Sequence, residues 1–452
     1  MNSYYVVKKQ FFKLIHYIKH FALSNHLLRG ATSSFALKII STSIALITNI
    51  LLARLMGKEG LGVYVYALTW VDLLRIPATL GLNQLIVREI AIYKAKELWN
   101  EFHGLVQWSS KLILCFSTFL AISAMIISIL TGTENNLEIT YAIAIALFLL
   151  PIKALTIART SILQGLEQIV KSQLPEYLLA PCLSLVFLGL AFFWADHTLP
   201  VNYALISRVL AFYIAFYVGS RWLTKSLPDA VKQSEPKLKI RYWLKSSIPL
   251  MFLEGILVVH NQTDLLMLGA IRGPEAVGIY SVLSRGVMLI VFVLGAVNTT
   301  LSPSIAKLFA LGETAKLQNI IARSARIVLF VSVAIGLLFI LGGHHFLLLF
   351  GKDFYEGRTA LNILAVAKML GATTTTASFL LTMTGHERHI VKSATVSTLA
   401  NIILNSLLIP KWGIEGAATA TGISSVFLHF WNGYSVWKST GINPTPFGII
   451  RK

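Results

Sequence analysis

Charged side chains are scarce in this sequence, and the stretches between them are apolar. Asp, Glu, Lys and Arg make up only 13% of the 452 residues, and the mean hydropathy is +0.69. A soluble domain carries about 25% charged residues, so the composition excludes an ordinary soluble protein. Because the apolar stretches reach the roughly 20 residues that cross a bilayer as a helix, the sequence predicts an all-α integral membrane protein.

Cysteine is nearly absent, and the usual motifs of nucleotide, metal and acyl-transfer sites do not occur. Cys115 and Cys182 both fall in the middle of predicted spans, where they are interpreted as small core residues. No P-loop, G-x-G-x-x-G motif, zinc-ligand spacing or nucleophile elbow is found. We therefore expect no cofactor, no metal ion and no catalytic residue, and ATP hydrolysis is unsupported as an energy source.

Acidic residues are few, so the chain is strongly basic. The 39 Lys and Arg against 20 Asp and Glu give a formal net charge of +19. Such a balance can indicate nucleic acid, but here the cations gather in short connections between apolar runs, which is the positive-inside pattern. Of the 39 cations, 28 lie on one side of the predicted membrane, 6 on the other and 5 within spans. This asymmetry predicts two cytoplasmic termini and no nucleic-acid partner.

The apolar runs divide into two groups of six around residues 224–243, the longest polar connection. The twelve predicted spans are residues 34–55, 61–82, 106–130, 139–162, 173–195, 200–223, 244–270, 276–300, 325–343, 357–384, 391–410 and 414–437. The predicted regions are a basic N-terminal segment (1–33), a first six-helix bundle (34–223), a cytoplasmic linker (224–243), a second six-helix bundle (244–438) and a tail (439–452).

Two stretches of the chain repeat each other and indicate an internal duplication. The first, Asn49–Ala91, places a tight glycine turn between two apolar runs, and the second, Leu265–Tyr280, follows the same plan. A constant offset of 216 pairs Gly57 with Gly273, Glu59 with Glu275, Gly62 with Gly278 and Tyr64 with Tyr280. Transporters are often built from two related halves. Because six spans is an even number, we expect both halves to keep one orientation, with a pseudo-twofold axis along the membrane normal.

The same stretches carry a resemblance to a known family. The segments ARLMGKEGLGVYVYALTWVDLL, LGLNQLIVREIA, TDLLMLGAIRGPEAVGIYSVLSRG and LIPKWGIEGAATATGIS resemble those of polysaccharide and O-antigen flippases of the multidrug/oligosaccharidyl-lipid/polysaccharide exporter superfamily. The resemblance implies movement of an undecaprenyl-diphosphate-linked oligosaccharide across the bacterial inner membrane by alternating access. It also implies as partners this lipid-linked oligosaccharide, membrane lipids and polysaccharide polymerase or assembly proteins.

Nine ionisable residues of the predicted spans are candidates for function, because an ionisable side chain at mid-bilayer costs at least about 2.5–3.5 kcal/mol unless it faces a bundle interior or a wet cavity. Their surplus of positive charge predicts a cationic central cavity for an anionic substrate such as a lipid-linked diphosphate. The candidate substrate contacts are Lys38, Arg75, Lys153, Arg208, Arg285 and Lys368, and the candidate ion-coupling acids are Asp72, Glu254 and Asp264. Lys153 and Lys368 are preferred because they occupy nearly matching places in the two halves.

Several of these charges also have a structural interpretation. Asp72 and Arg75 are three residues apart on one helix and could neutralise each other. Arg285 could pair with Asp264 across neighbouring spans. Two cations near span ends could extend to the lipid headgroups instead: Lys38 and Arg208. Uncharged polar residues of the spans could form hydrogen bonds with sugar hydroxyls or with a neighbouring helix. They include Asn83, Asn401 and Asn405.

The first 29 residues form a basic, aromatic lead-in. On a helix, Val7, Phe11 and Ile15 share one face and Lys9 and Lys13 lie opposite. This pattern predicts an amphipathic helix on the anionic cytoplasmic leaflet, with a solvated tail as the alternative. A cleaved signal peptide is not expected, because cations interrupt the apolar core that it needs.

Other functions remain open at this point. A multidrug antiporter of the same superfamily would bind cations in an acid-rich cavity. The acids Glu254 and Asp264 leave this function open as an alternative. A membrane polymerase or ligase would need a sizeable periplasmic loop, whereas the longest predicted outer connection, residues 343–357, is short. A lipid II flippase usually has fourteen spans, and this chain has room for twelve.

Overall fold

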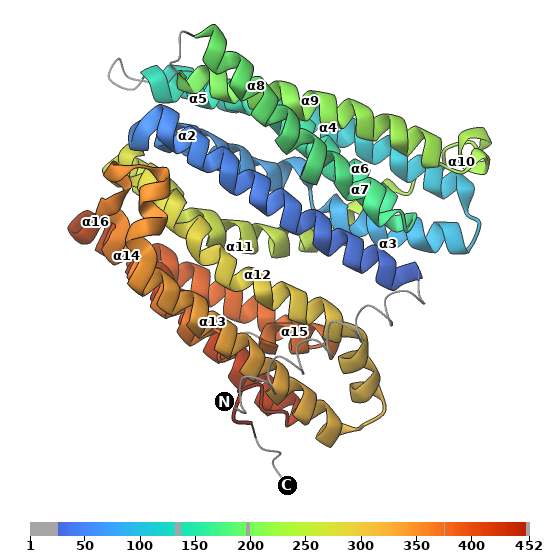
Figure 1. Ribbon diagram of the computed structural model, residues 1–452. Helices are drawn as coiled ribbons and strands as arrows, with labels where there is room; N and C mark the ends of the chain where they lie inside the picture. Colours follow the sequence, from blue (N-terminus) through green and yellow to red (C-terminus); the bar gives the residue numbers. More distant parts are fainter. Residues whose placement is uncertain (1–25, 132–136, 196–198, 375, 449–452) are drawn as a thin grey trace.

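The computed structural model describes residues 26–131, 137–195, 199–374 and 376–448, and it describes only the backbone of residues 26–35, 291–304, 306–307 and 310. Within these ranges every regular element is a helix (Figure 1), which confirms the predicted all-α class. The predicted amphipathic lead-in lies outside the described residues.

The helices follow the apolar runs of the sequence. The first half contains α2 (His26–Thr79), α3 (Leu82–Ala95), α4 (Trp99–Thr131), α5 (Leu137–Leu147), α6 (Leu149–Gly165), α7 (Ile169–Leu174), the π-helical η2 (Pro175–Leu179), α8 (Ala180–Trp194) and α9 (Val201–Ser226). After the short α10 (Asp229–Gln233), the second half contains α11 (Ile240–Arg272), α12 (Pro274–Ala310), α13 (Thr314–Phe350), the 3-10 turn η3 (Lys352–Gly357), α14 (Arg358–Gly371), α15 (Thr376–Met383) and α16 (Glu387–Thr440). A helix satisfies its own backbone hydrogen bonds, as a chain in lipid must.

Several of these helices are long enough to cross a membrane. By length and composition, eight of those described can span it, or nine if the bent pair Lys352–Gly371 and Thr376–Met383 counts as one span. Two of the eight contain a glycine with a non-helical backbone, Gly57 in α2 and Gly413 in α16. The chain is therefore a multi-pass membrane protein, and its division into twelve spans stays a prediction.

The duplicated turns have the same backbone conformation. Gly57 has φ 69° and ψ −174°, and its predicted counterpart Gly273 has φ 83° and ψ −179°. This region of the Ramachandran plot is open almost only to glycine, because a Cβ would clash with the backbone. The repeat seen in the sequence therefore extends to the local geometry of the chain.

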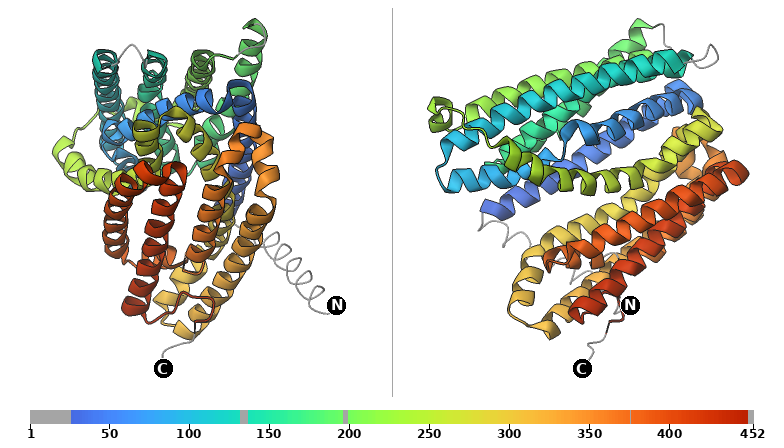
Figure 2. Two further views of the ribbon diagram at one scale, coloured as in Figure 1. Left: turned by 90° about the vertical axis from the view of Figure 1, so that its left-hand side faces the viewer. Right: turned by 180° about the vertical axis from the view of Figure 1, so that it is seen from behind.

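The helices form two groups, α2–α9 and α12–α16, and α11 lies between them (Figure 1). Helix α11 packs on α2 and α3 of the first group and on α16 of the second. We call the end with Gly57 and Gly273 the hairpin end, and the end with α10 the linker end. The groups meet at the hairpin end and diverge toward the linker end (Figure 2).

The two duplicated turns touch each other at the hairpin end. A side chain on Gly62 would overlap the carbonyl oxygen of Pro274, and one on Gly278 would overlap the carbonyl oxygen of Lys58. Lys58 and Pro274 are themselves separated by the offset of 216, so the contact is pseudo-symmetric. Only glycine allows two helix starts to approach this closely, and the approach joins the two halves.

Polar contacts surround this glycine contact. The Nζ atom of Lys58 lies 3.1 Å from Oε1 of Glu356 and 3.6 Å from Oε2 of Glu275. The Nε of Arg54 donates to the carbonyl oxygen of Leu349 at 2.7 Å. Exposed ion pairs contribute at most about 1 kcal/mol each, so the close backbone approach is the main cause of closure at this end.

At the linker end, the start of α11 is attached to the first half. The indole Nε1 of Trp243 donates to the hydroxyl of Tyr93 at 3.1 Å, and the hydroxyl of Tyr242 donates to the buried Glu89 carboxylate at 3.0 Å. Burial raises the pKa of Tyr93 to about 12, so its hydroxyl stays neutral. The start of α11, which directly follows the connection between the halves, is therefore fixed to the first half by these hydrogen bonds.

Candidate functional site

The first half pairs one of its interior lysines with an acid. Lys153 of α6 places Nζ 2.7 Å from Oδ1 of Asp72 on α2. The two side chains are 14% and 32% exposed, so the pair is largely screened from solvent by protein. The acid that pairs with Lys153 thus lies on an adjacent helix. The pair leaves this part of the interior electrically neutral.

A second ion pair crosses between the halves. Nη1 of Arg75 on α2 lies 3.2 Å from Oε1 of Glu254 on α11, and Nδ2 of Asn83 donates to the other carboxylate oxygen at 2.9 Å. The suggestion that Asp72 and Arg75 neutralise each other is wrong, because each reaches a partner on a neighbouring helix. These contacts attach the linker-side part of α11 to the first half.

Arg208 of α9 lies in an aromatic setting. Its Nη1 donates to the hydroxyl of Tyr64 at 3.1 Å, and its guanidinium stacks over the rings of Tyr64 and Phe212 at 5.9 and 5.5 Å. Arginine is suited to such packing because its planar group stacks on aromatic faces. Arg208 is therefore held inside the bundle and does not extend to a headgroup, whereas Lys38 is exposed on α2.

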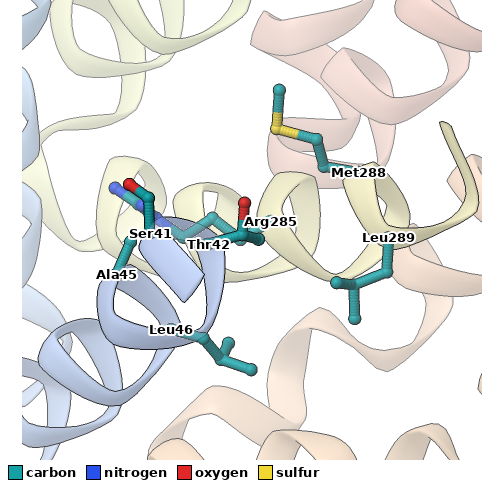
Figure 3. A pocket seen from close by; sticks show the side chains of 7 residues that line it. All are labelled: Ser41, Thr42, Ala45, Leu46, Arg285, Met288 and Leu289. Carbon is teal, nitrogen blue, oxygen red and sulfur yellow. The ribbon is translucent and has the colours of Figure 1, made fainter. Parts of the chain in front are cut away.

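Arg285 of α12 lines a pocket between the two halves. The pocket has a volume of about 280 Å³ and lies between α2 and α12. Its lining consists of Ser41, Thr42, Ala45, Leu46, Arg285, Met288 and Leu289. The Arg285 side chain extends from α12 toward α2, where Ser41 and Thr42 present their hydroxyls (Figure 3). Within the described ranges Arg285 forms no ion pair, so the suggested pairing with Asp264 is wrong.

Asp264 of α11 is held by neutral donors alone. The carboxylate accepts hydrogen bonds from Tyr280 at 2.8 Å, Asn405 at 2.8 Å and Asn401 at 3.3 Å, and from the hydroxyl of Thr421. The residue is only 5% exposed. Hydrogen bonds to an ionised group are stronger than neutral ones, and four of them compensate its burial. The Nδ2 groups of Asn401 and Asn405 therefore donate to this carboxylate and are not available to sugar hydroxyls.

Lys368 of α14 has surroundings unlike those of Lys153. It is partly buried and forms no ion pair with a described residue; Asp264 is the acid that acts on it electrostatically. Two histidines that the sequence analysis overlooked accompany it, His260 on α11 and His429 on α16. The signal was available for one of them, because His260 and Asp264 are four residues apart and share a helix face.

Sequence reasoning also missed a buried ion pair in the first half. Arg159 is 3% exposed in α6 and pairs with Glu176 of the π-helical η2. Its Nη1 also donates to the carbonyl oxygens of Ala215 and Phe216 at 3.3 and 3.2 Å, where Gly219 leaves room for it. Because both Nη atoms of Arg159 are bonded to groups on neighbouring elements, the pair is a structural tie between helices.

Two family models and one curated relative match this chain. The polysaccharide biosynthesis protein model matches residues 27–309, which is more than half of the chain, and the MatE model matches residues 249–407. A protein from Shigella flexneri described as a candidate O-antigen transporter is 22% identical over 400 residues. That alignment covers 85% of this chain and 91% of the relative.

Two solved structures share the fold. An inward-facing multidrug resistance MATE transporter of the MOP superfamily has a TM-score of 0.71 and 16% identity over 91% of this chain and 99% of its own. The lipid II flippase MurJ in an inward closed conformation has a TM-score of 0.69 and 17% identity over 90% of this chain and 87% of its own. Because the polysaccharide biosynthesis protein model matches more than half of the chain, the chain belongs to that family.

Proposed function

We propose that this protein is a flippase that moves an undecaprenyl-diphosphate-linked oligosaccharide from the cytoplasmic to the periplasmic leaflet of the bacterial inner membrane. The observation that carries the proposal is Arg285, a cation in the pocket between the halves that forms no ion pair with any residue the structure describes. An arginine guanidinium binds phosphate oxygens through two parallel hydrogen bonds. The family supports this substrate class, since its model describes polysaccharide biosynthesis.

The balance of interior charges favours an anionic substrate. Arg75 and Lys153 are neutralised by Glu254 and Asp72. Among the described residues, the interior candidate cations without an acidic partner are Arg208, Arg285 and Lys368, and the candidate acid without a cationic partner is Asp264. In a site with little water, such a surplus attracts a diphosphate strongly, because the attraction between opposite charges at a given distance is larger at a low dielectric constant.

The pocket also suits the lipid character of the substrate. Ser41, Thr42 and Arg285 supply its polar wall, and apolar side chains of α2 and α12 supply the rest. A diphosphate attached to a polyprenyl chain needs both kinds of surface in one place. The lipid chain stays in the bilayer while the headgroup crosses, so no bond is made or broken.

Transport would proceed by alternating access between the two groups of helices. In this structure the groups meet at the hairpin end, through Gly62 and Gly278, and diverge at the linker end. With twelve spans and both termini in the cytoplasm, the linker end faces the cytoplasm, so the substrate enters there. Separation of the two turns would then open the periplasmic side. Asp264, Glu254 and Asp72 are the acids through which an ion gradient would drive the change.

A cation-coupled multidrug antiporter is the second candidate. It is favoured by the MatE match over residues 249–407, which contains Glu254 and Asp264. A carrier of cationic drugs needs an acidic binding site, however, and both of these acids are occupied by other groups of the protein. Among the candidate residues that the structure describes, those left without an oppositely charged partner are mostly cations, so we place this candidate below the flippase.

A deletion strain tests the proposal directly. We expect the strain to lose its surface polysaccharide and to accumulate undecaprenyl-linked repeat units in the cytoplasmic leaflet, with unchanged tolerance to cationic drugs. The wild-type chain should restore export, and Arg285→Ala at equal membrane levels should not. Normal polysaccharide together with altered drug tolerance would establish the antiporter instead.

A further inference from the structure

Two basic side chains of the first half bind groups of the second half at the hairpin end. On α2, Arg54 donates from Nε to the carbonyl oxygen of Leu349 at 2.7 Å and from Nη2 to that of Leu348 at 3.2 Å. Both carbonyls belong to the end of α13. The Nζ atom of Lys58, also on α2, lies 3.1 Å from Oε1 of Glu356 in η3. We call Arg54 and Lys58, with the groups that they bind, the hairpin latch.

The carbonyl groups that Arg54 binds lie in the last turn of α13, where a helix has no N–H groups of its own to offer. The N–H of Gly351 bonds to the carbonyl oxygen of Leu347, and with φ 138° Gly351 takes the chain out of the helix. The next two carbonyls, of Leu348 and Leu349, accept from Arg54 instead. A cation is also favoured at a helix C-terminus by the negative end of the helix dipole. Arg54 therefore caps α13, although the two belong to different halves.

The same chemistry occurs a second time at the hairpin end, but inside the second half. Arg272 at the end of α11 donates from Nε to the carbonyl oxygen of Ile409 at 3.1 Å and from Nη2 to that of Pro410 at 2.6 Å. These carbonyls lie just before the non-helical Gly413 of α16. Arg54 and Arg272 thus bind helix ends in the same way, and of the two only Arg54 connects α2 to the second half.

Both contacts of the latch are open to water. Arg54 is exposed, and the side chains of Lys58 and Glu356 are 22% and 63% exposed. Water can satisfy the end of a helix as a side chain does, and exposed ion pairs are weak. The latch can therefore break and re-form readily, whereas the backbone approach at Gly62 and Gly278 fixes the shape of the closed end.

The position of the latch connects it to alternating access. The groups of helices meet at the hairpin end and diverge at the linker end (Figure 2). To open the hairpin end, α2 must separate from α13 and η3, which breaks both latch contacts and leaves those of Arg272 in place.

We propose that Arg54 and Lys58 are a reversible latch that holds the hairpin end closed, and that water replaces Arg54 at the end of α13 when this end opens. The inference rests on the alternating access of the proposed flippase, for which it names the residues that set the balance between the two states. Arg54 is the stronger part, because its planar guanidinium binds two carbonyls at once.

The distance between two labels across the hairpin end tests the latch in the purified full-length protein, reconstituted in lipid nanodiscs. Nitroxide labels are attached at Glu59→Cys of the first turn and Asp353→Cys of η3, both exposed sites. The native cysteines, Cys115 and Cys182, are exposed as well and are replaced by serine. With the latch intact, we expect mainly one short distance, and a minor longer distance that represents the open end.

Variants of the latch should shift this ratio in a fixed order. Arg54→Gln should raise the ratio of open to closed molecules about five- to tenfold, as expected for the loss of a charged contact to a helix C-terminus. Arg54→Lys keeps the charge but not the paired donors, so its ratio should lie between those of Arg54→Gln and the unmutated protein. Lys58→Gln should raise the ratio about twofold, because its ion pairs are exposed.

Arg272→Gln is the matched control, since it removes the same kind of contact inside the second half. It should leave the ratio unchanged, even where thermal unfolding shows lower stability. An unchanged ratio in Arg54→Gln would make Arg54 a helix cap only, and equal shifts in Arg54→Gln and Arg272→Gln would indicate general loosening. Either result overturns the latch, and Arg54→Lys provides the same comparison should Arg54→Gln fail to fold.

This test is separate from that of the proposed function, because the label distance is measured without substrate. If the deletion strain loses export but Arg54→Gln stays closed, the latch is wrong and the flippase stands. If the strain exports normally while Arg54→Gln opens the hairpin end, the latch stands and the flippase is wrong.

Discussion

Lys153 on α6 and Lys368 on α14 hold comparable places in the two halves of the chain, yet their surroundings differ. Lys153 forms an ion pair of 2.7 Å with Asp72, whereas Lys368 forms no ion pair with a described residue and interacts electrostatically with two histidines and with Asp264, whose carboxylate is already hydrogen-bonded. The duplicated turns behave in the opposite way, because Gly57 and Gly273 have the same backbone conformation. The duplication has therefore kept the scaffold and let the interior chemistry of the halves diverge.

This difference suggests that the two halves of the protein have different roles in transport. The first half ties its interior charges together through Asp72–Lys153 and Arg159–Glu176, and it also holds the start of α11. Arg208, which forms no ion pair with a described residue, is stacked on aromatic rings. In the second half, neither Arg285 nor Lys368 forms an ion pair within the part of the chain that the structure describes. We infer that the first half is the more rigid body and that the second half carries most of the substrate contacts.

The largest effect should come from the turns that both halves share. Gly62→Ala and Gly278→Ala each place a methyl group against a backbone carbonyl of the opposite turn, which cannot yield as a side chain can. Overpacking of this kind costs about 1–3 kcal/mol or more. The protein can then no longer adopt the conformation in which the hairpin end is closed, and export stops. The measurement is surface polysaccharide at matched membrane levels, with labelling of a cysteine at the hairpin end.

The two glycine variants should be equivalent, because their contacts are pseudo-symmetric. Gly189→Ala is the control, since a Cβ there has nothing within 4 Å. A strong defect in only one of the two variants would show that the halves do not contribute equally to closure. The conclusion that the duplicated turns of the two halves are equivalent would then be wrong.

The second-largest effect on export should come from substitution of Arg285, which has no charged counterpart in the first half. The offset of 216 places Thr69 there, a buried residue whose hydroxyl donates to the carbonyl oxygen of Val65 at 2.8 Å. Arg285→Ala removes a charged donor, worth about 1.5–3 kcal/mol, so export should fall about tenfold or more. Thr69→Ala should leave export close to wild type. Equal loss in both variants would count against an asymmetric substrate site.

The matched lysines give a third and smaller contrast, in stability. Lys153→Met leaves Asp72 partly buried without its partner and should lower the free energy of unfolding by about 1–3 kcal/mol, less than for a fully buried pair because Asp72 is 32% exposed. Lys368→Met breaks no ion pair and should leave stability unchanged or slightly higher. Thermal unfolding in detergent measures both, and the double variant with Asp72→Asn should recover part of the first loss.

How far the sequence alone predicts these features depends on the range of the interactions involved. Helix class, membrane character and the glycine repeat follow from local composition and spacing, and they were predicted. The partners of Asp72, Arg75 and Asp264 were not, because each lies on a helix distant in sequence. His429 carried no signal either, since only packing against α14 brings it to Lys368. Interior charges can thus be found from a sequence, but their pairing requires the fold.

The smallest effect should come from the attachment of α11 to the first half. Trp243→Phe keeps an aromatic ring in a fully buried position but removes the donor to the Tyr93 hydroxyl. A neutral hydrogen bond contributes about 1 kcal/mol, so the midpoint of thermal unfolding should fall slightly. Export should be nearly normal, because the first half moves as one body with the start of α11. A large export defect at near-normal stability would mean that α11 turns at this contact during transport, and the first half would then be less rigid than the comparison of the two halves implies.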